Sequence, residues 1–329
     1  MPASIPLFDE AGPPPIAVIQ DQLALSAKLD TLVPGKVLDR NLLVASWNVR
    51  MLGTVGPRWT NDPNDSPKRN LADVWALAEI ISRFDVVAVQ EVRDDLIGLR
   101  LIARSLGADW SFIVTDVVRG AAGNHERLAF LFDQRRVKPS GLAGELVLSV
   151  EDTARLEIGR QFARTPFLVS FVSAGNPFTL ASVHVIWGDD VSQRAKEAGA
   201  LADLLRLSVK DPSPKTPDDF RRNLIALGDF NIAKQGDAGF QALVNNGLTP
   251  DPSLAGLPRT VGEKAGNVTA FDQVAWIAKG QEGALGFDRT SAGTIPWDAL
   301  LERDPAEGDS TFRISDHYPL WVEFALPAR

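Results

Sequence analysis

The chain has no cysteine and only three histidines among its 329 residues. The missing cysteines exclude disulfide bridges, thiolate zinc sites and cysteine nucleophiles, and they leave the compartment open. No apolar run is long enough to cross a bilayer, so we expect no membrane span. The first fifteen residues are polar and proline-rich, without the hydrophobic segment of a signal peptide. This favours a cytoplasmic protein.

A surplus of positive charge is also missing, since the formal net charge is −8. Bulk electrostatic attraction to nucleic acid is therefore not indicated. An acidic nuclease is still compatible with this charge if a metal ion and local arginines offset the carboxylates at its site. The composition, 45% hydrophobic and 23% charged, is that of a globular protein with enough chain to bury a core.

The pattern along the chain predicts an N-terminal extension over residues 1–36 and one domain over residues 37–329. Within the extension, residues 20–30 predict a short helix. Amphipathic patterns predict further helices over 69–83, 94–106 and 191–207. Short β-branched and aromatic runs predict eight strands, several of them buried on both faces: 42–49, 86–92, 127–132, 167–172, 178–186, 224–230, 273–277 and 320–326. Together they predict an α/β (α+β) domain with a central β-sandwich flanked by helices.

Polar clusters stand at the ends of these predicted strands. Taken singly, each has an ordinary structural explanation, such as a solvent-facing strand end, a core histidine or an Asx turn. His125 is expected to face solvent. Taken together, they predict one polar pocket, because strand ends of one sheet can converge at one edge. The clusters contain Asn48, Glu91, Glu126, His184, Asp229 with Asn231, Asp272, and Asp316 with His317.

The residue types in these clusters indicate a class of chemistry. Asn and Glu supply the hard oxygen ligands that Mg²⁺ or Mn²⁺ prefers, and an adjacent acid and imidazole can bind a metal and move a proton. Asp229 and Asn231, two apart on an extended strand, face the same way and suit a phosphate, a water or a second metal. With no thiol and no serine-nucleophile motif, the set favours metal-assisted hydrolysis of an anionic ester, most naturally a phosphoester.

In order along the chain, these segments resemble the motifs of the endonuclease/exonuclease/phosphatase superfamily, and most closely its deoxyribonuclease I group. The resemblance implies a four-layered α/β-sandwich, in which two packed, mainly antiparallel sheets are flanked by helices. It covers most of the chain outside the extension. The segments that carry it are Trp47-Asn48-Val49-Arg50, Val89-Gln90-Glu91-Val92-Arg93-Asp94, Gly228-Asp229-Phe230-Asn231 and Ser315-Asp316-His317-Tyr318-Pro319.

Two features are similar to the deoxyribonuclease I group rather than to the abasic-site endonucleases. A histidine, His184, ends an apolar strand where the abasic-site enzymes have a tyrosine. A Glu-Arg pair, Glu126 and Arg127, precedes an aromatic strand. The resemblance implies that Glu126 pairs with His184 and that Arg164 contacts a substrate phosphate. The chain departs from the secreted members in lacking disulfides and in having Asn124 where they have a tyrosine.

The resemblance implies a role for each candidate. Glu91, Asn48 and Asp316 would hold Mg²⁺ or Mn²⁺, with Ca²⁺ as an alternative. His317, oriented by Asp272, would accept the proton of an attacking water.

In the same scheme, His184, oriented by Glu126, would protonate the leaving oxygen, and the two histidine roles could be exchanged. Asp229 and Asn231 would bind phosphate, water or a second metal. Arg164 would grip the phosphate, and the remaining candidates for contact with a DNA groove or backbone are Arg50 and Arg93.

Two other functions stay open at this point. One is a phosphatase or phospholipase-type diesterase on the same scaffold, acting on phosphoinositides, sphingomyelin or nucleotides. The other is a binding module with an inactive site, which is disfavoured because no matched catalytic position is substituted. The arginines near the motifs favour DNA as substrate, and we expect a monomer.

Overall fold

The structure is a computed structural model that describes residues 6–60, 62, 64–119, 123–188, 190–210, 223–264, 267–302 and 310–327. Two six-stranded sheets form its centre. The first sheet has the order β11 (Asp288–Thr294), β12 (Leu320–Ala325), β1 (Asn41–Leu52), β2 (Val86–Arg93), β4 (Glu126–Asp133) and β3 (Trp110–Val114). The second sheet has the order β5 (Lys138–Glu145), β6 (Phe167–Ser173), β7 (Asn176–His184), β8 (Leu224–Ile232), β10 (Ala270–Trp276) and β9 (Thr249–Pro250).

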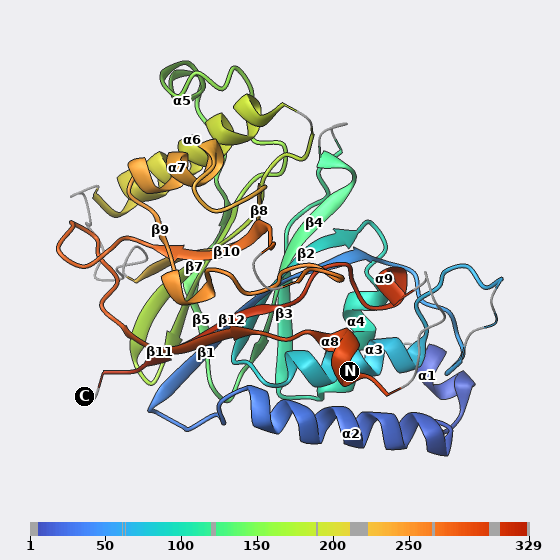
Figure 1. Cartoon of the computed structure of the whole chain (residues 1–329). Helices are drawn as coiled ribbons and strands as arrows, with labels where there is room; N and C mark the ends of the chain where they lie inside the picture. The colour runs from blue at the N-terminus through green and yellow to red at the C-terminus, as the bar shows by residue number, and fades with distance from the viewer. Residues whose placement is uncertain are drawn as a thin grey trace.

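Each sheet contains one parallel pair among antiparallel neighbours. In the first sheet β1 runs parallel to β2, and in the second β7 runs parallel to β8. Both parallel pairs are central, so their apolar side chains are covered on both faces. The carboxyl ends of these four strands point to the same end of the sandwich (Figure 1).

Residue alternation assigns the two faces of each sheet. In β1, Leu42 and Val44 belong to the apolar cluster between the sheets, while Leu43, Ala45 and Trp47 belong to the cluster on the outer face. This is the period of two expected of an extended strand. The cluster between the sheets is rich in phenylalanine, and its rings stack edge-on or offset, including those of Phe130, Phe171, Phe178, Phe287 and Phe324.

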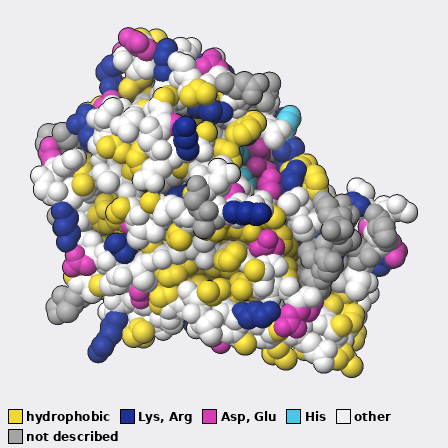
Figure 2. All heavy atoms as spheres, viewed as in Figure 1, with side chains coloured by type: hydrophobic (Ala, Val, Ile, Leu, Met, Phe, Trp, Pro, Cys, Tyr) yellow, Lys and Arg dark blue, Asp and Glu magenta, His cyan; other side chains and the backbone are white. Residues whose placement is uncertain are grey.

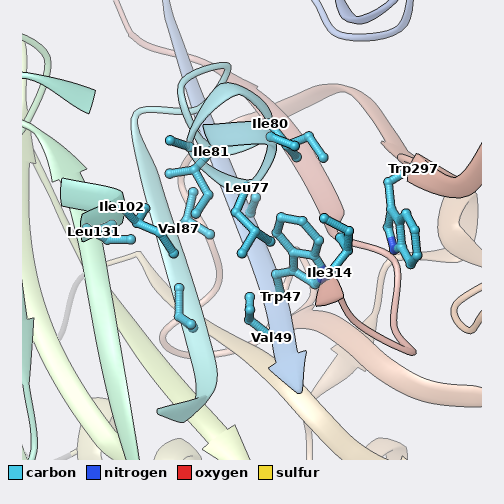
Figure 3. Packing of buried hydrophobic residues seen from close by; sticks show 14 of the residues in the cluster. Trp47, Val49, Leu77, Ile80, Ile81, Val87, Ile102, Leu131, Trp297 and Ile314 are labelled. Atoms are coloured by element: carbon cyan, nitrogen blue, oxygen red, sulfur yellow. The ribbon is translucent and has the colours of Figure 1, made fainter. Parts of the chain in front are cut away.

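Helices cover both outer faces (Figure 1). Over the first sheet lie α2 (Ile16–Leu32), α3 (Leu71–Ile81), α4 (Ile97–Leu106) and α8 (Trp297–Leu300). In Figure 3, Leu77 of α3 lies beside the ring of Trp47 in β1. Over the second sheet lie α6 (Val191–Lys210) and α7 (Ala238–Asn245). The predicted four-layered α/β-sandwich is confirmed. The short helices are α1 (Pro6–Ala11), α5 (Val150–Arg155) and α9 (Ser310–Arg313), and η2 (Pro252–Leu254) is a 3₁₀ turn.

Two predicted helix boundaries are wrong. The helix predicted over residues 20–30 spans Ile16–Leu32, and Leu25 and Leu29 are fully buried against the rest of the fold. The helix predicted over 94–106 begins at Ile97, because the Asp95 carboxylate accepts a hydrogen bond from the Ile97 amide at 2.8 Å. A carboxylate that takes up a first-turn N–H marks the helix start from just outside it. Among the described helices, none is long and apolar enough to span a membrane.

Candidate active site

At one end of the sandwich, the inward-facing positions of several strands change from apolar to polar residues. In β4, β8 and β10, the inward positions Leu128, Leu227 and Val274 are apolar, and the next inward position is Glu126, Asp229 or Asp272. Since successive inward positions lie two residues apart, each of these acids faces the space between the sheets. Figure 2 shows acidic and histidine side chains in a hollow of the surface, with Lys and Arg side chains at its edge.

His317 and Asp272 form the first acid–imidazole pair. His317 Nδ1 lies 2.7 Å from Asp272 Oδ2, and both residues are buried. Burial raises the pKa of Asp272 to about 6. Burial alone would lower the pKa of His317, but the carboxylates of Asp272, Asp229 and Asp316 outweigh it and raise that pKa to about 10. The pair therefore favours the imidazolium–carboxylate form at neutral pH.

His184 and Glu126 form the second pair, which Arg164 extends. His184 Nδ1 lies 2.9 Å from Glu126 Oε2. The Arg164 guanidinium donates to both oxygens of Glu126, with Nε at 2.5 Å and Nη2 at 3.2 Å. Burial would raise the pKa of Glu126, but His184 and Arg164 lower it to about 2. Glu126 is thus a carboxylate throughout the neutral range, able to orient the imidazole beside it.

Asp229 lies between the two histidines. Its Oδ2 atom is 3.7 Å from His184 Nε2 and 3.8 Å from His317 Nε2. Both imidazoles therefore direct their second nitrogen at one carboxylate oxygen. The other oxygen, Oδ1, accepts the backbone N–H of Asn231 at 2.9 Å, and the Asn231 amide donates to the Val185 carbonyl at 2.6 Å. The Asx-type bond at Asp229 is present, and it orients the carboxylate within the pocket.

Glu91 enters the pocket because the strands around it are irregular. Pairing shifts register between Asn48 and Leu52 in β1 and between Val89 and Val92 in β2, and Glu91 itself has φ +59°. A bulge of this kind re-aims a side chain that the regular pleat would direct elsewhere. Glu91 Oε1 accepts a hydrogen bond from the Asn48 side-chain amide at 2.9 Å, and Oε2 accepts one from the Met51 backbone N–H at 3.1 Å.

The predicted metal ligands leave two oxygen atoms without partners. Asn48 Oδ1 and Asp316 Oδ1 are buried and have no hydrogen-bond partner within the described ranges. Buried acceptors of this kind are costly unless something binds them. Carboxylate and amide oxygens are the ligand types that Mg²⁺, Mn²⁺ or Ca²⁺ prefers, and Glu91, Asn48 and Asp316 remain the predicted ligands.

A second possible ligand group shares Glu91. Ligand atoms of Glu91, Glu126 and His184 all lie within 4.8 Å of one another. Arg164 already neutralises Glu126 in this group, which makes it the less favourable site for a cation.

The other predicted arginines contact protein groups. Arg50 Nη1 lies 3.4 Å from Asp316 Oδ2 and donates to the Thr311 hydroxyl at 2.9 Å. Arg93 Nη1 donates to the Asn124 carbonyl at 2.7 Å. Arg164 Nη1 is buried without a hydrogen-bond partner among the described residues, so this arginine keeps one donor group for a ligand. His125 is exposed, as predicted.

Sequence reasoning missed the residues that hold the His317 segment. The indole N–H groups of Trp47 and Trp297 both donate to the His317 carbonyl, at 2.9 and 3.1 Å. Arg69 is fully enclosed and donates to four backbone carbonyls, those of Arg50, Met51, Arg313 and Ile314. It thereby joins the end of β1 to the segment before Asp316. A lone arginine before a helix carries no sequence signal for this role, because its partners are backbone atoms distant along the chain.

Gly228 allows the parallel strands to approach at the site, and we expect Gly228→Ala to destabilise the protein. Gly228 has φ +144°, and a Cβ atom there would lie 2.0 Å from the Val183 carbonyl oxygen. The clash involves backbone, so the free energy of unfolding should fall by at least about 3 kcal/mol. Urea denaturation followed by circular dichroism measures this.

Gly35→Ala is the matched control, since a Cβ at Gly35 meets nothing within 4 Å. We expect it to unfold at the wild-type urea concentration. A Gly228→Ala protein as stable as Gly35→Ala would contradict the close approach of β7 and β8.

The family comparison covers every candidate site residue from Asn48 to His317. The Endonuclease/Exonuclease/phosphatase family matches residues 45–317, a range that runs from just before Trp47 to His317. The chain belongs to this family. A deoxyribonuclease from Thioalkalivibrio sp. (strain K90mix) is 28% identical over 316 residues, which cover 92% of this chain and 75% of that protein.

Solved structures of the family share the fold. An endonuclease/exonuclease/phosphatase family protein from Bacteroides thetaiotaomicron superposes with a TM-score of 0.58 at 16% identity, covering 88% of this chain and 99% of the other. The human Nocturnin catalytic domain with bound sulfate superposes with a TM-score of 0.56 at 16% identity, covering 88% and 95%. The family is hydrolytic, which agrees with a pocket of acids and imidazoles.

Proposed function

We propose that the protein is a metal-dependent phosphodiesterase that hydrolyses DNA. The observation that carries the proposal is the convergence of two carboxylate-held imidazoles, His184 and His317, on one oxygen of Asp229. In-line hydrolysis needs one group to take a proton from water and another to give one to the leaving oxygen. Two imidazoles on either side of one acid meet both needs. The similarity to a deoxyribonuclease supports DNA as the substrate.

The carboxylates determine what each imidazole can do. Asp272 and Glu126 each bind the Nδ1 side of their histidine, which leaves Nε2 free to exchange a proton within the pocket. The raised pKa of His317 makes this residue a proton donor at neutral pH. His317 is therefore assigned as the group that protonates the leaving oxygen and His184 as the group that accepts the proton of water, which is the exchange of roles that the resemblance leaves open. Asp229 and Asn231 would orient the phosphate and the water.

Charge on the phosphate has two sources of compensation. The Nη1 group of Arg164 would donate to a phosphate oxygen. Glu91, Asn48 and Asp316 would hold a divalent cation, Mg²⁺ or Mn²⁺ in the first place, and a bound cation would neutralise charge that develops on the phosphate oxygens.

Nicking of supercoiled plasmid tests the proposal. We expect Mg²⁺-dependent conversion of supercoiled plasmid to open circles, measured by gel electrophoresis, and no conversion in EDTA. A protein that leaves plasmid and oligonucleotides intact but hydrolyses phosphate monoesters or sphingomyelin would overturn the DNA assignment. The same gel assay with Mn²⁺ or Ca²⁺ in place of Mg²⁺ identifies the preferred metal.

A further inference from the structure

An exposed tryptophan stands at the rim of the pocket. Trp187 follows His184 by three residues and is 61% exposed, which sets it apart from the other tryptophans of the described chain. Its ring meets Phe271 edge-on at a centroid distance of 5.6 Å, and Phe271 lies 6.3 Å from the His317 ring. Aromatic surface therefore runs from solvent to the imidazole at the reacting centre.

The segment that carries Trp187 is held by α6. The Arg194 guanidinium lies over the indole, 5.7 Å from its centroid, and also donates to the Gly188 carbonyl. The buried carboxylate of Glu197 accepts the Ile186 amide at 2.9 Å. Backbone contacts thus hold the chain on both sides of the tryptophan, and the ring is placed before any ligand arrives.

This arrangement suits a flat aromatic ligand. A single exposed apolar side chain is ordinary, but this one is ordered by a cation and lies one ring away from the catalytic histidine. Aromatic rings beside an arginine form the stacking surfaces that bind nucleobases, and they accept any base because every base has a π face.

We propose that Trp187 and Phe271 form a stacking surface for an unpaired nucleobase next to the scissile phosphate. The inference rests on the proposed DNA hydrolysis. Bases inside a duplex are stacked on each other and cannot offer a face to a protein ring, so the surface selects single strands and locally opened duplex. Arg194 would add a positive charge near the adjoining phosphate.

The test compares Trp187→Ala with wild type on three substrates. These are a single-stranded oligodeoxynucleotide, the duplex of the same sequence, and a base-free strand with the same sugar-phosphate backbone. We expect wild type to prefer the single strand over the duplex. For the single strand, Trp187→Ala should raise KM about tenfold with little change in kcat. A tenfold rise in KM is the effect expected from the loss of stacking on one base. For the base-free strand, the two proteins should be equal.

Two further variants make the result specific. Trp187→Phe should recover most of the affinity, because it keeps an aromatic face. Val150→Ala, which removes an 82% exposed side chain on α5, should match wild type on every substrate. Thermal unfolding of each variant should stay near that of wild type, since Trp187 is mostly in solvent.

The outcomes separate this inference from the proposed function. Suppose that wild type hydrolyses the single strand. If Trp187→Ala then has the wild-type KM for that strand, or raises the KM for the base-free strand by the same factor, the stacking surface is refuted while DNA hydrolysis stands. If wild type hydrolyses none of the three substrates in Mg²⁺, the proposed function fails, and the stacking inference fails with it.

Discussion

Replacing His317 or His184 with alanine is expected to lower kcat on DNA by roughly 10²–10⁴-fold each, which is the usual worth of a general acid or base. Each imidazole has its Nδ1 side held by a carboxylate and its Nε2 side directed at Asp229. Alanine removes the proton-transferring group and leaves the backbone contacts intact, including the two indole bonds to the His317 carbonyl. Single-turnover cleavage of a labelled oligonucleotide measures the loss.

The third histidine provides the control for this prediction. His125 is exposed, with its nearest acid, Asp94, at 3.8 Å. We expect His125→Ala to cleave at the wild-type rate. The double variant of His184 and His317 should lose less than the product of the single losses, because groups that act in one step are not additive. Wild-type turnover in both single variants would refute the assignment.

The second large effect is expected at the metal ligands. EDTA should abolish activity, and excess Mg²⁺ should restore it. Glu91→Gln keeps the shape of the side chain but removes its charge, so we expect the Mg²⁺ concentration for half-maximal activity to rise at least about 100-fold. Loss of even an outer-shell partner of a metal ligand costs about 10–100-fold. A metal titration of the cleavage rate measures the change.

A second readout separates binding from catalysis. A ligand that binds only the folded state stabilises it, by about 2.7 kcal/mol at a hundred times its dissociation constant. Mg²⁺ should therefore raise the melting temperature of wild type and have a much smaller effect on Glu91→Gln. Asp94→Asn, an exposed acid three residues along the chain, should respond as wild type does. Equal responses in all three proteins would contradict a metal site at Glu91.

The eight strands predicted from apolar runs are the eight interior strands of the two sheets. The four strands that escaped prediction, β3, β5, β9 and β11, are the four edges. An interior strand is enclosed on both faces and reads as a continuous apolar run, whereas an edge strand is half in solvent. In β5 the residues include a proline and two glycines and alternate between exposed and half-buried, so no apolar pattern marks the strand.

Strand alternation, which can be read from the sequence, indicates which acidic residues share one face of a sheet. Alternation along an extended strand places Glu126, Asp229 and Asp272 on the inward face, since each lies two residues from an apolar inward position of its strand. The resemblance to a family then connected Glu126 with His184, a pairing that separation along the chain does not reveal. The structure places these two side chains 2.9 Å apart.

The way in which these side chains share the pocket depends on tertiary packing. Two imidazoles meet at one Asp229 oxygen, Glu91 enters through strand irregularities, and the buried Arg69 joins two site segments through backbone carbonyls. Such relations depend on sheet packing and on local departures from regular pairing. A linear pattern records the period of a strand, but it does not record a bulge or a contact between two sheets.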